Sequence, residues 1–140
     1  MRAWAPVFVS LEATLSPTVY GAFYPEGWQS AQRKSVEQTC GDAAVHTWVW
    51  EEQGRAVGFV AVKRHSNELG EIYIIAVDPD YQRRGIARAL TELAVDRLRA
   101  SGVSVAMVET GADTGHAPAR AAYDGCGFEL FPVARYFKKL

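Results

Sequence analysis

The sequence predicts an α/β domain in which helices flank a central mixed β-sheet. Three observations predict this fold class. First, the chain has 140 residues, 49% of them apolar, which is enough for one domain with a hydrophobic core. Second, strand-like and helix-like segments alternate from Gly70 onward. Third, the clearest helix stands between two strand-like segments, and a helical crossover normally joins parallel strands. No repeat or linker interrupts the chain, so we expect a single domain over residues 1–140.

The first forty residues indicate helices separated by a turn. Val7 to Leu15 reads as a helix that ends before a proline, and Trp28 to Thr39 reads as a second helix with Gly41 just beyond it. Between them, Tyr20 to Gly27 contains two glycines and a proline. These residues favour a turn or loop.

The middle of the chain predicts three strands. Val45 to Glu51 and Ala56 to Lys63 are rich in β-branched and aromatic residues. The turn signal Gln53-Gly54 stands between them and indicates a hairpin. Gly70 to Val77 is a third strand, which Asp78-Pro79 ends.

The last part of the chain alternates helix and strand. Gly85 to Ala100 carries apolar residues at helical spacing and is followed by a strand over Val103 to Val108. A short helix is expected from Ala117 to Cys126. Phe128 to Leu140 reads as a last extended strand, interrupted by Pro132.

Composition excludes several classes of protein. Fifteen basic and 16 acidic residues give a net charge of −1, so no global field favours nucleic acid or an anionic membrane. No apolar stretch approaches the roughly 20 residues of a membrane span, and a cytoplasmic location is expected. The three histidines are scattered and the cysteines form no metal-ligand spacing. Cys40 and Cys126 are expected to be buried thiols, with a disulfide as the alternative.

The segment from Val77 to Ala87 carries the strongest chemical signal. It connects a strand to the start of the long helix, where backbone N–H groups have no helical partner and the helix dipole adds positive charge. Arg83 and Arg84 bring two charges, and Gly85 lets a ligand approach the backbone. The pattern favours a phosphate or pyrophosphate site, and the alternative is an ordinary polar turn.

Two motifs resemble the landmarks of the GNAT acetyltransferase family. Gln82-Arg83-Arg84-Gly85-Ile86-Ala87 is similar to the signature Gln/Arg-x-x-Gly-x-Gly/Ala, and the run from Ala119 to Phe128 is similar to Ala-x-x-x-Tyr-x-x-x-Gly-Phe. The resemblance covers residues 45–140 and implies the GNAT fold. It also implies transfer of an acetyl group from acetyl-coenzyme A (acetyl-CoA) to an amine by direct attack. Many members begin with a strand, for which only Met1 to Pro6 are available here.

The resemblance also implies where CoA binds. The pyrophosphate is expected on the loop of Gln82, Arg83, Arg84, Gly85, Ile86 and Ala87. Backbone groups of Ile75, Ala76 and Val77 are expected to bind the pantetheine arm, as an added strand would. His116 stands where many members have an asparagine that bonds to the cofactor region, or it caps the helix before Pro118. Arg120 either reaches the phosphate end of the cofactor or lies on a solvated helix face.

Two residues are candidates for proton transfer. Glu71 to Val77 resembles the pattern Glu-Ile-x-x-x-Ala-Ile, which carries the base glutamate in the histone-acetylating branch of the family. Glu71 is therefore the candidate general base, although it could instead be an exposed strand-end residue with water as the base. Tyr123 occupies the tyrosine position of the second motif and is the candidate general acid for the leaving thiolate. Its alternative is a core tyrosine.

The acceptor side is less well defined. The candidate lining residues lie around a loop rich in glycine and proline, and most of them could equally be core residues: Tyr20, Phe23, Tyr24, Glu26 and Trp28. Strand alternation places Tyr73 on the same face as Glu71, where it could touch the acceptor. The acceptor could be a small-molecule amine, a peptide N-terminus or a lysine side chain.

Other classes of function remain as alternatives. One is a catalytically inactive GNAT-fold module that binds acyl-CoA. Another, a nucleotide-binding or nucleic-acid-associated domain, is disfavoured because the chain lacks a basic stripe. Family members are often dimers, and Val133 to Lys138 could pair with a second copy to form a homodimer.

Overall fold

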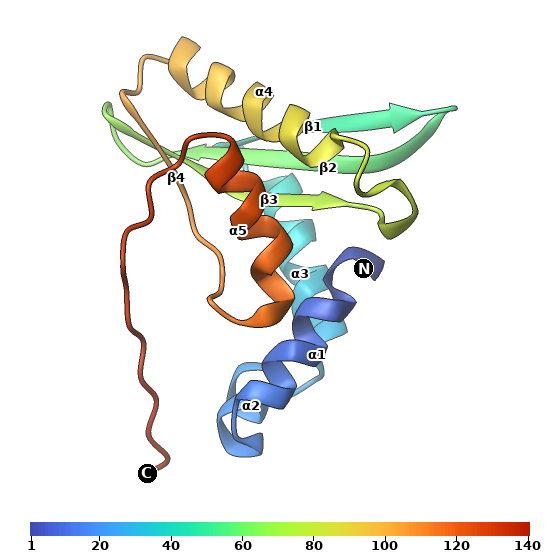
Figure 1. Cartoon of the computed structure of the whole chain (residues 1–140), viewed down its shortest axis with the longest axis vertical. Helices are drawn as coiled ribbons and strands as arrows, with labels where there is room; N and C mark the ends of the chain where they lie inside the picture. Colours follow the sequence, from blue (N-terminus) through green and yellow to red (C-terminus); the bar gives the residue numbers. More distant parts are fainter.

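A mixed four-stranded sheet lies at the centre of the protein (Figure 1). The computed structural model describes residues 1–140 and orders the strands β1-β2-β3-β4. Strands β1 (Val45–Glu52), β2 (Arg55–Arg64) and β3 (Leu69–Val77) are antiparallel neighbours, and β4 (Val105–Val108) runs parallel to β3. The predicted hairpin and the predicted parallel pair are confirmed.

The hairpin turn between β1 and β2 has the backbone that its sequence predicts. Gln53 and Gly54 have φ angles of 52° and 74°. Positive φ at both central residues matches the right-handed twist of the flanking strands, and glycine adopts it without strain.

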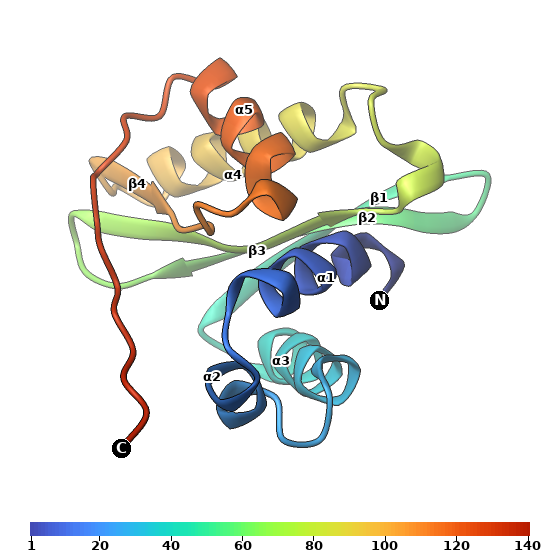
Figure 2. The same cartoon turned by 60° about the horizontal axis from the view of Figure 1, so that its bottom comes forward.

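Helices cover both faces of the sheet (Figure 2). Helix α4 (Ile86–Ala100) packs on β2 and β3, and α5 (Ala117–Gly125) lies beside α4. Helices α1 (Ala5–Thr14) and α3 (Trp28–Gly41) lie on the opposite face. Three short 3-10 turns complete the chain: η1 (Arg2–Trp4), η2 (Pro79–Tyr81) and η3 (Thr114–His116). No strand precedes α1 in this chain.

The hydrophobic core lies between the sheet and α4. Leu90, Ala94 and Leu98 of α4 are at most 3% exposed. They pack on a layer of β-branched residues from the strands and their flanks, namely Val57, Val60, Val62, Ile72, Val77 and Val103. Gly70 lets α4 approach β3, because a Cβ there would stand 2.4 Å from a Leu98 methyl carbon. The end of α4 therefore packs closely against the start of β3.

The predicted turn over Tyr20 to Gly27 is partly wrong. Residues Pro17–Phe23 form helix α2, and the chain turns only after Phe23. Ser16 caps this helix, since its Oγ accepts a hydrogen bond from the Val19 N–H at 3.4 Å. A serine followed by proline at the first helical position is a helix start signal, which the glycine inside the segment obscured.

The predicted last strand is also wrong. The Phe128 N–H donates to the Tyr123 carbonyl, and no later residue forms a backbone hydrogen bond. A strand is defined by its pairing, and residues 129–140 run past the sheet without pairing (Figure 1). Leu130, Phe131 and Tyr136 are more than four-fifths exposed there, at 83%, 84% and 90%.

None of the helices is both long enough and apolar enough to span a membrane.

Candidate active site

Strands β3 and β4 separate part-way along their length. Their pairing ends at Ile72 and Val108. From Ile74 to Val77, β3 pairs with β2 alone, so its other edge has no strand partner. A register shift at Tyr73 marks a β-bulge at the point of separation. This arrangement leaves backbone groups of β3 available to a ligand.

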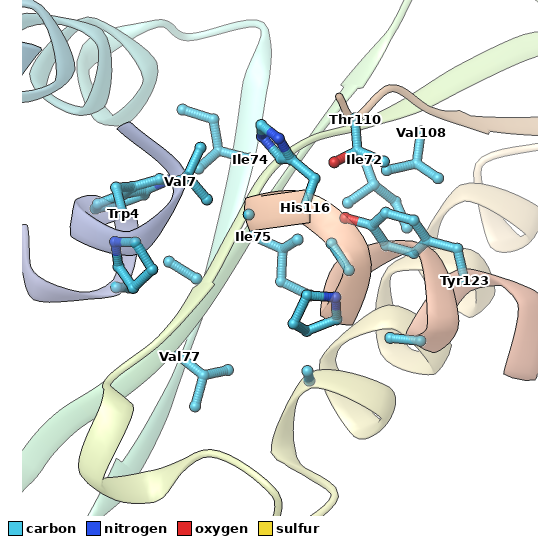
Figure 3. Close-up of a pocket in the computed structure, with 18 of the residues that line it drawn as sticks. Trp4, Val7, Ile72, Ile74, Ile75, Val77, Val108, Thr110, His116 and Tyr123 are labelled. Atoms are coloured by element: carbon cyan, nitrogen blue, oxygen red, sulfur yellow. The ribbon is translucent and has the colours of Figure 1, made fainter. Parts of the chain in front are cut away.

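A cavity of about 790 Å³ opens at this separation. Figure 3 shows Trp4 and Val7 on one side of β3, with Val108 and Tyr123 on the other. Ile75, Ala76 and Val77 of β3 line the cavity, as expected from the sequence. The cavity therefore extends across the edge of the strand and has two sides.

One end of the cavity meets the loop before α4. The backbone N–H groups from Arg83 to Arg88 donate no hydrogen bond within the protein. Arg83 and Gly85 have φ angles of 61° and 82°, in the left-handed region. Such a loop at a helix N-terminus forms an anion-binding nest. Gln82, Arg83, Gly85 and Ala87 line the cavity here.

The other side chains of the signature hold the loop in place. Arg84 donates to the Asp80 carbonyl at 2.8 Å, and its guanidinium lies 4.9 Å from the centre of the Tyr81 ring. Gln82 Nε2 donates to the Val77 carbonyl at 3.0 Å. Ile86 is 3% exposed and belongs to the core. Of the two arginines, Arg83 lines the cavity and Arg84 does not.

Two aspartates on this loop pair with distant arginines. Arg2 donates to both carboxylate oxygens of Asp80 at 2.8 and 3.0 Å, and to Asp78 at 3.4 Å. Arg55 contacts the other oxygen of Asp78 at 3.2 Å. The hydrogen bond and charge of Arg2 lower the pKa of Asp80. Sequence reasoning missed these contacts because no local pattern joins residues 2 and 80.

A histidine and an aspartate shape the loop before α5. His116 lines the cavity, and its Nδ1 is 2.5 Å from Asp113 Oδ2. Burial raises the pKa of Asp113, but the hydrogen bonds from His116 and Ser10 outweigh burial and leave it lowered. Arg120 donates to the carbonyls of Gly111 and Asp113 at 2.6 and 2.8 Å, so it holds this loop.

Tyr123 directs its hydroxyl group into the cavity (Figure 3). The residue is 8% exposed, and its ring packs edge-on against Phe128 at 5.9 Å. Its hydroxyl forms no hydrogen bond within the protein, so it is available to a ligand. Burial raises the pKa of Tyr123 to about 12, so the hydroxyl stays protonated at physiological pH.

Glu71 lies near the cavity but does not line it. Its Oε2 is 2.6 Å from His65 Nε2, and its side chain is 13% exposed. Lys63, directly opposite Glu71 on β2, lies 5.7 Å from the centre of the Tyr73 ring. Tyr73 therefore shares the face of Glu71, as expected, and it lines the cavity.

The side of the cavity opposite Tyr123 is built mainly by the N-terminal segment. Its lining residues here are Trp4, Val7, Phe8, Leu11 and Tyr24. Sequence reasoning identified Tyr24 but missed the lining face of α1, because the apolar residues of that helix are not confined to one face. Trp28 does not line the cavity. Its ring stacks on that of Phe8, with 4.5 Å between the ring centres. Tyr20 likewise packs against Tyr24 at 5.0 Å.

The sequence matches a known family over most of its length. The model of the acetyltransferase (GNAT) family matches residues 17–128. The chain belongs to the GNAT acetyltransferase family. The open edge of β3, the loop before α4 and Tyr123 all lie within the matched part.

Curated relatives include mycothiol acetyltransferases. That of Thermomonospora curvata is 35% identical over 83 residues, which are 59% of this chain and 27% of the relative. That of Corynebacterium glutamicum is 34% identical over 113 residues, covering 77% of this chain and 37% of the relative. The chain thus matches well under half the length of these relatives.

Solved structures share the fold. An aminoglycoside N-acetyltransferase in complex with CoA is 18% identical with a TM-score of 0.64, over 81% of this chain and 90% of that chain. A GNAT family acetyltransferase from Elizabethkingia anophelis with acetyl-CoA bound is 17% identical with a TM-score of 0.64, over 71% and 63%. An IAA acetyltransferase from Bacillus cereus is 26% identical with a TM-score of 0.63, over 71% and 63%.

Proposed function

We propose that this chain is an N-acetyltransferase domain that moves the acetyl group of acetyl-CoA to an amine. The observation that carries the proposal is the cavity at the separation of β3 and β4, which joins an anion-binding loop to the Tyr123 hydroxyl. Membership of the GNAT family supports it. Acetyl-CoA would supply an activated thioester, and the protein would supply binding, orientation and proton handling.

The residues present fit CoA from its diphosphate to its thiol. The free N–H groups from Arg83 to Arg88 and the Arg83 guanidinium suit the diphosphate. The unpaired edge of β3 at Ile75, Ala76 and Val77 suits the two amides of the pantetheine arm, which would bond to it as a strand does. His116 and Tyr123 line the part of the cavity beyond that edge.

Tyr123 is proposed to assist the leaving sulfur. The amine nitrogen forms a bond to the acetyl carbon, the carbon–sulfur bond breaks, and negative charge moves onto sulfur. A hydroxyl that is protonated and free of other partners can donate a hydrogen bond to that charge. Because the pKa of Tyr123 is raised to about 12, this donor persists across the physiological range.

Glu71 is proposed to take the proton that the amine loses, directly or through water. Its carboxylate is held by His65 at 2.6 Å on the face that also carries Tyr73. A carboxylate that is 13% exposed can be reached through a short water chain. We expect Glu71→Gln to lower turnover and to leave CoA affinity unchanged. Unchanged turnover would assign the role of base to water alone.

The acceptor is proposed to be a small-molecule amine. The names of the relatives, mycothiol acetyltransferase and aminoglycoside N-acetyltransferase, favour this class. The acceptor side of the cavity, lined by Trp4, Phe8, Leu11, Tyr24 and Tyr73, offers rings and aliphatic surface that suit the apolar faces of a small ring. A peptide amine is the second candidate, because the cavity is open to solvent.

The proposal is tested first by calorimetric titration of acetyl-CoA into the purified protein. Micromolar binding is expected, and release of CoA thiol is then followed with a panel of an aminoglycoside, a lysine peptide and simple sugar amines. No binding of acetyl-CoA would overturn the proposal. Binding without thiol release from any amine would instead support an inactive acyl-CoA-binding module.

We also propose that two copies of the chain associate through the C-terminal segment. Leu130, Phe131, Val133 and Tyr136 expose a run of large apolar side chains there, and the outer edge of β4 has no partner. Exposed apolar runs and free strand edges favour association. Light scattering should give a dimer mass, which Phe131→Asp should reduce to that of a monomer. A wild-type monomer would refute the proposal.

A further inference from the structure

We propose that Arg2 and Ser10 are positioning residues that hold helix α1 as a strap across the cavity. The strap joins the two loops that border the opening between β3 and β4. These are the loop before α4 (residues 78–85) and the loop before α5 (residues 109–116). The functional part of this inference rests on the proposed binding of acetyl-CoA, but the strap itself can be tested without any ligand.

The first anchor joins the start of the strap to the loop before α4. Arg2 holds Asp80 with both terminal nitrogens, at 2.8 and 3.0 Å, and also reaches Asp78 at 3.4 Å. A planar guanidinium that bonds a carboxylate twice fixes its partner's orientation as well as its position. Asp80 in turn accepts from Arg84 through its carbonyl. The anchor therefore acts on the backbone of the anion-binding loop.

The second anchor joins the other half of α1 to the loop before α5. Ser10 Oγ accepts from the Gly115 N–H at 3.0 Å and lies 3.1 Å from Thr114 Oγ1. Helix and loop are in direct contact here. A Cβ on Gly115 would stand 2.8 Å from Ser10 Cβ and 2.9 Å from Val7 Cα. His116, which lines the cavity, follows directly in the chain.

The two anchors act on different parts of the proposed site. Ser10 stands eight positions after Arg2, which corresponds to roughly 12 Å along a helix. Between them, Trp4, Val7 and Phe8 form the acceptor wall. Any widening of the opening must strain one anchor, so the acceptor wall, the anion-binding loop and the His116 loop are expected to move together. Binding of CoA at the loop would then order the acceptor wall.

Hydrogen exchange of the ligand-free protein tests the strap. The variants are Arg2→Met, Ser10→Ala and the double variant, with Arg99→Met as the matched control. Arg99 is also an exposed arginine paired to an aspartate, Asp96, but it lies on α4 away from the cavity. Loss of an exposed ion pair is expected to raise exchange about five-fold in both α1 and residues 80–82, whose N–H groups are hydrogen-bonded to Asp78 and Pro79. The control should change neither segment, and Arg2→Lys should restore part of the protection.

The same variants distinguish a local effect of the strap from a general loss of stability. A merely structural role would raise exchange throughout, including in β2, whereas the strap confines the change to α1 and the two loops. With saturating CoA, the wild type should show slower exchange in α1, and Arg2→Met should lose this effect and bind CoA about two- to five-fold more weakly. Unchanged exchange of residues 80–82 in Arg2→Met would overturn the strap. Failure of the wild type to bind CoA, with exchange still coupled, would overturn the proposed function alone.

Discussion

Replacement of Tyr123 by phenylalanine removes one oxygen from the cavity and should leave the packing intact. Tyr123 is 8% exposed and its ring contacts Phe128 edge-on. The phenylalanine ring of the variant can keep this packing. The hydroxyl has no hydrogen-bond partner within the protein, so its loss leaves no other polar group unsatisfied. We therefore expect the variant to fold normally, with a melting temperature within about 2 °C of the wild type.

The size of the catalytic effect follows from the pKa of Tyr123, which burial raises to about 12. An ordinary thiol has a pKa of roughly 8.5, so full proton transfer from Tyr123 to the leaving thiolate is uphill by about 3.5 units, or ~5 kcal/mol. Tyr123 is thus expected to donate a hydrogen bond to the sulfur rather than to lose its proton. Hydrogen bonds to charged groups contribute roughly 1.5–3 kcal/mol, which corresponds to about a 10- to 150-fold decrease in kcat.

The assay is steady-state release of thiol at saturating acetyl-CoA, with CoA affinity measured separately by calorimetry. Tyr136→Phe is the control, because Tyr136 is 90% exposed on the C-terminal segment. Ionisation of Tyr123 should not lower the wild-type kcat below about pH 11. A Tyr123→Phe kcat within two-fold of the wild type would refute the role. So would an equal loss of CoA affinity, which would place the hydroxyl in binding instead.

Three further predictions follow from the packing and charge of the site. Gly70→Ala should lower the free energy of unfolding by about 1–3 kcal/mol, measured by urea unfolding, because its Cβ would stand 2.4 Å from a Leu98 methyl carbon. An unchanged urea midpoint would contradict the close approach of α4 to β3. Arg83→Ala should weaken CoA binding at least ten-fold and Arg84→Ala less than three-fold, because Arg83 lines the cavity and Arg84 does not. If calorimetry showed the larger loss of affinity for Arg84→Ala, the proposed phosphate contact would be reassigned to Arg84. Asp113 has a lowered pKa, so its contribution to stability is present above the unfolded pKa near 4 and is lost as pH falls through its folded pKa. Asp113→Asn should therefore be less stable than the wild type at pH 7 and should lose less stability between pH 5 and pH 3. Parallel acid-denaturation curves of the two proteins would exclude this.

Local patterns were sufficient where the structure is set by neighbours in the chain. The Gln53-Gly54 turn and the α4 helix were both predicted because each depends on backbone preference and helical spacing alone. The loop before α4 was predicted for the same reason, since a glycine with φ of 82° opens the helix. The parallel pair followed from the helical crossover between the strands.

Contacts between distant segments could not be predicted. Arg83 and Arg84 look alike in the sequence, and only the packing of Arg84 on Tyr81 and Asp80 distinguishes it from Arg83, which lines the cavity. The pairing of Arg2 with Asp80 spans 78 positions and leaves no local pattern. The last strand was wrong because an extended apolar segment becomes a strand only when an edge accepts it, and the sequence does not show which edge that is.

The charges of the loop explain how a nearly neutral chain can present an anion site. Four arginines surround the loop, namely Arg2, Arg55, Arg83 and Arg84, and two of them offset Asp78 and Asp80. Four positive charges less two negative ones leave the loop at about +2, whereas the whole chain carries −1. The surplus resides on Arg83 and Arg84, beside the free N–H groups. Removal of Arg2 would leave the Asp80 carboxylate without its partner beside the loop before α4. Arg2, which is proposed to position α1, therefore also maintains the local charge on which the proposed anion site depends.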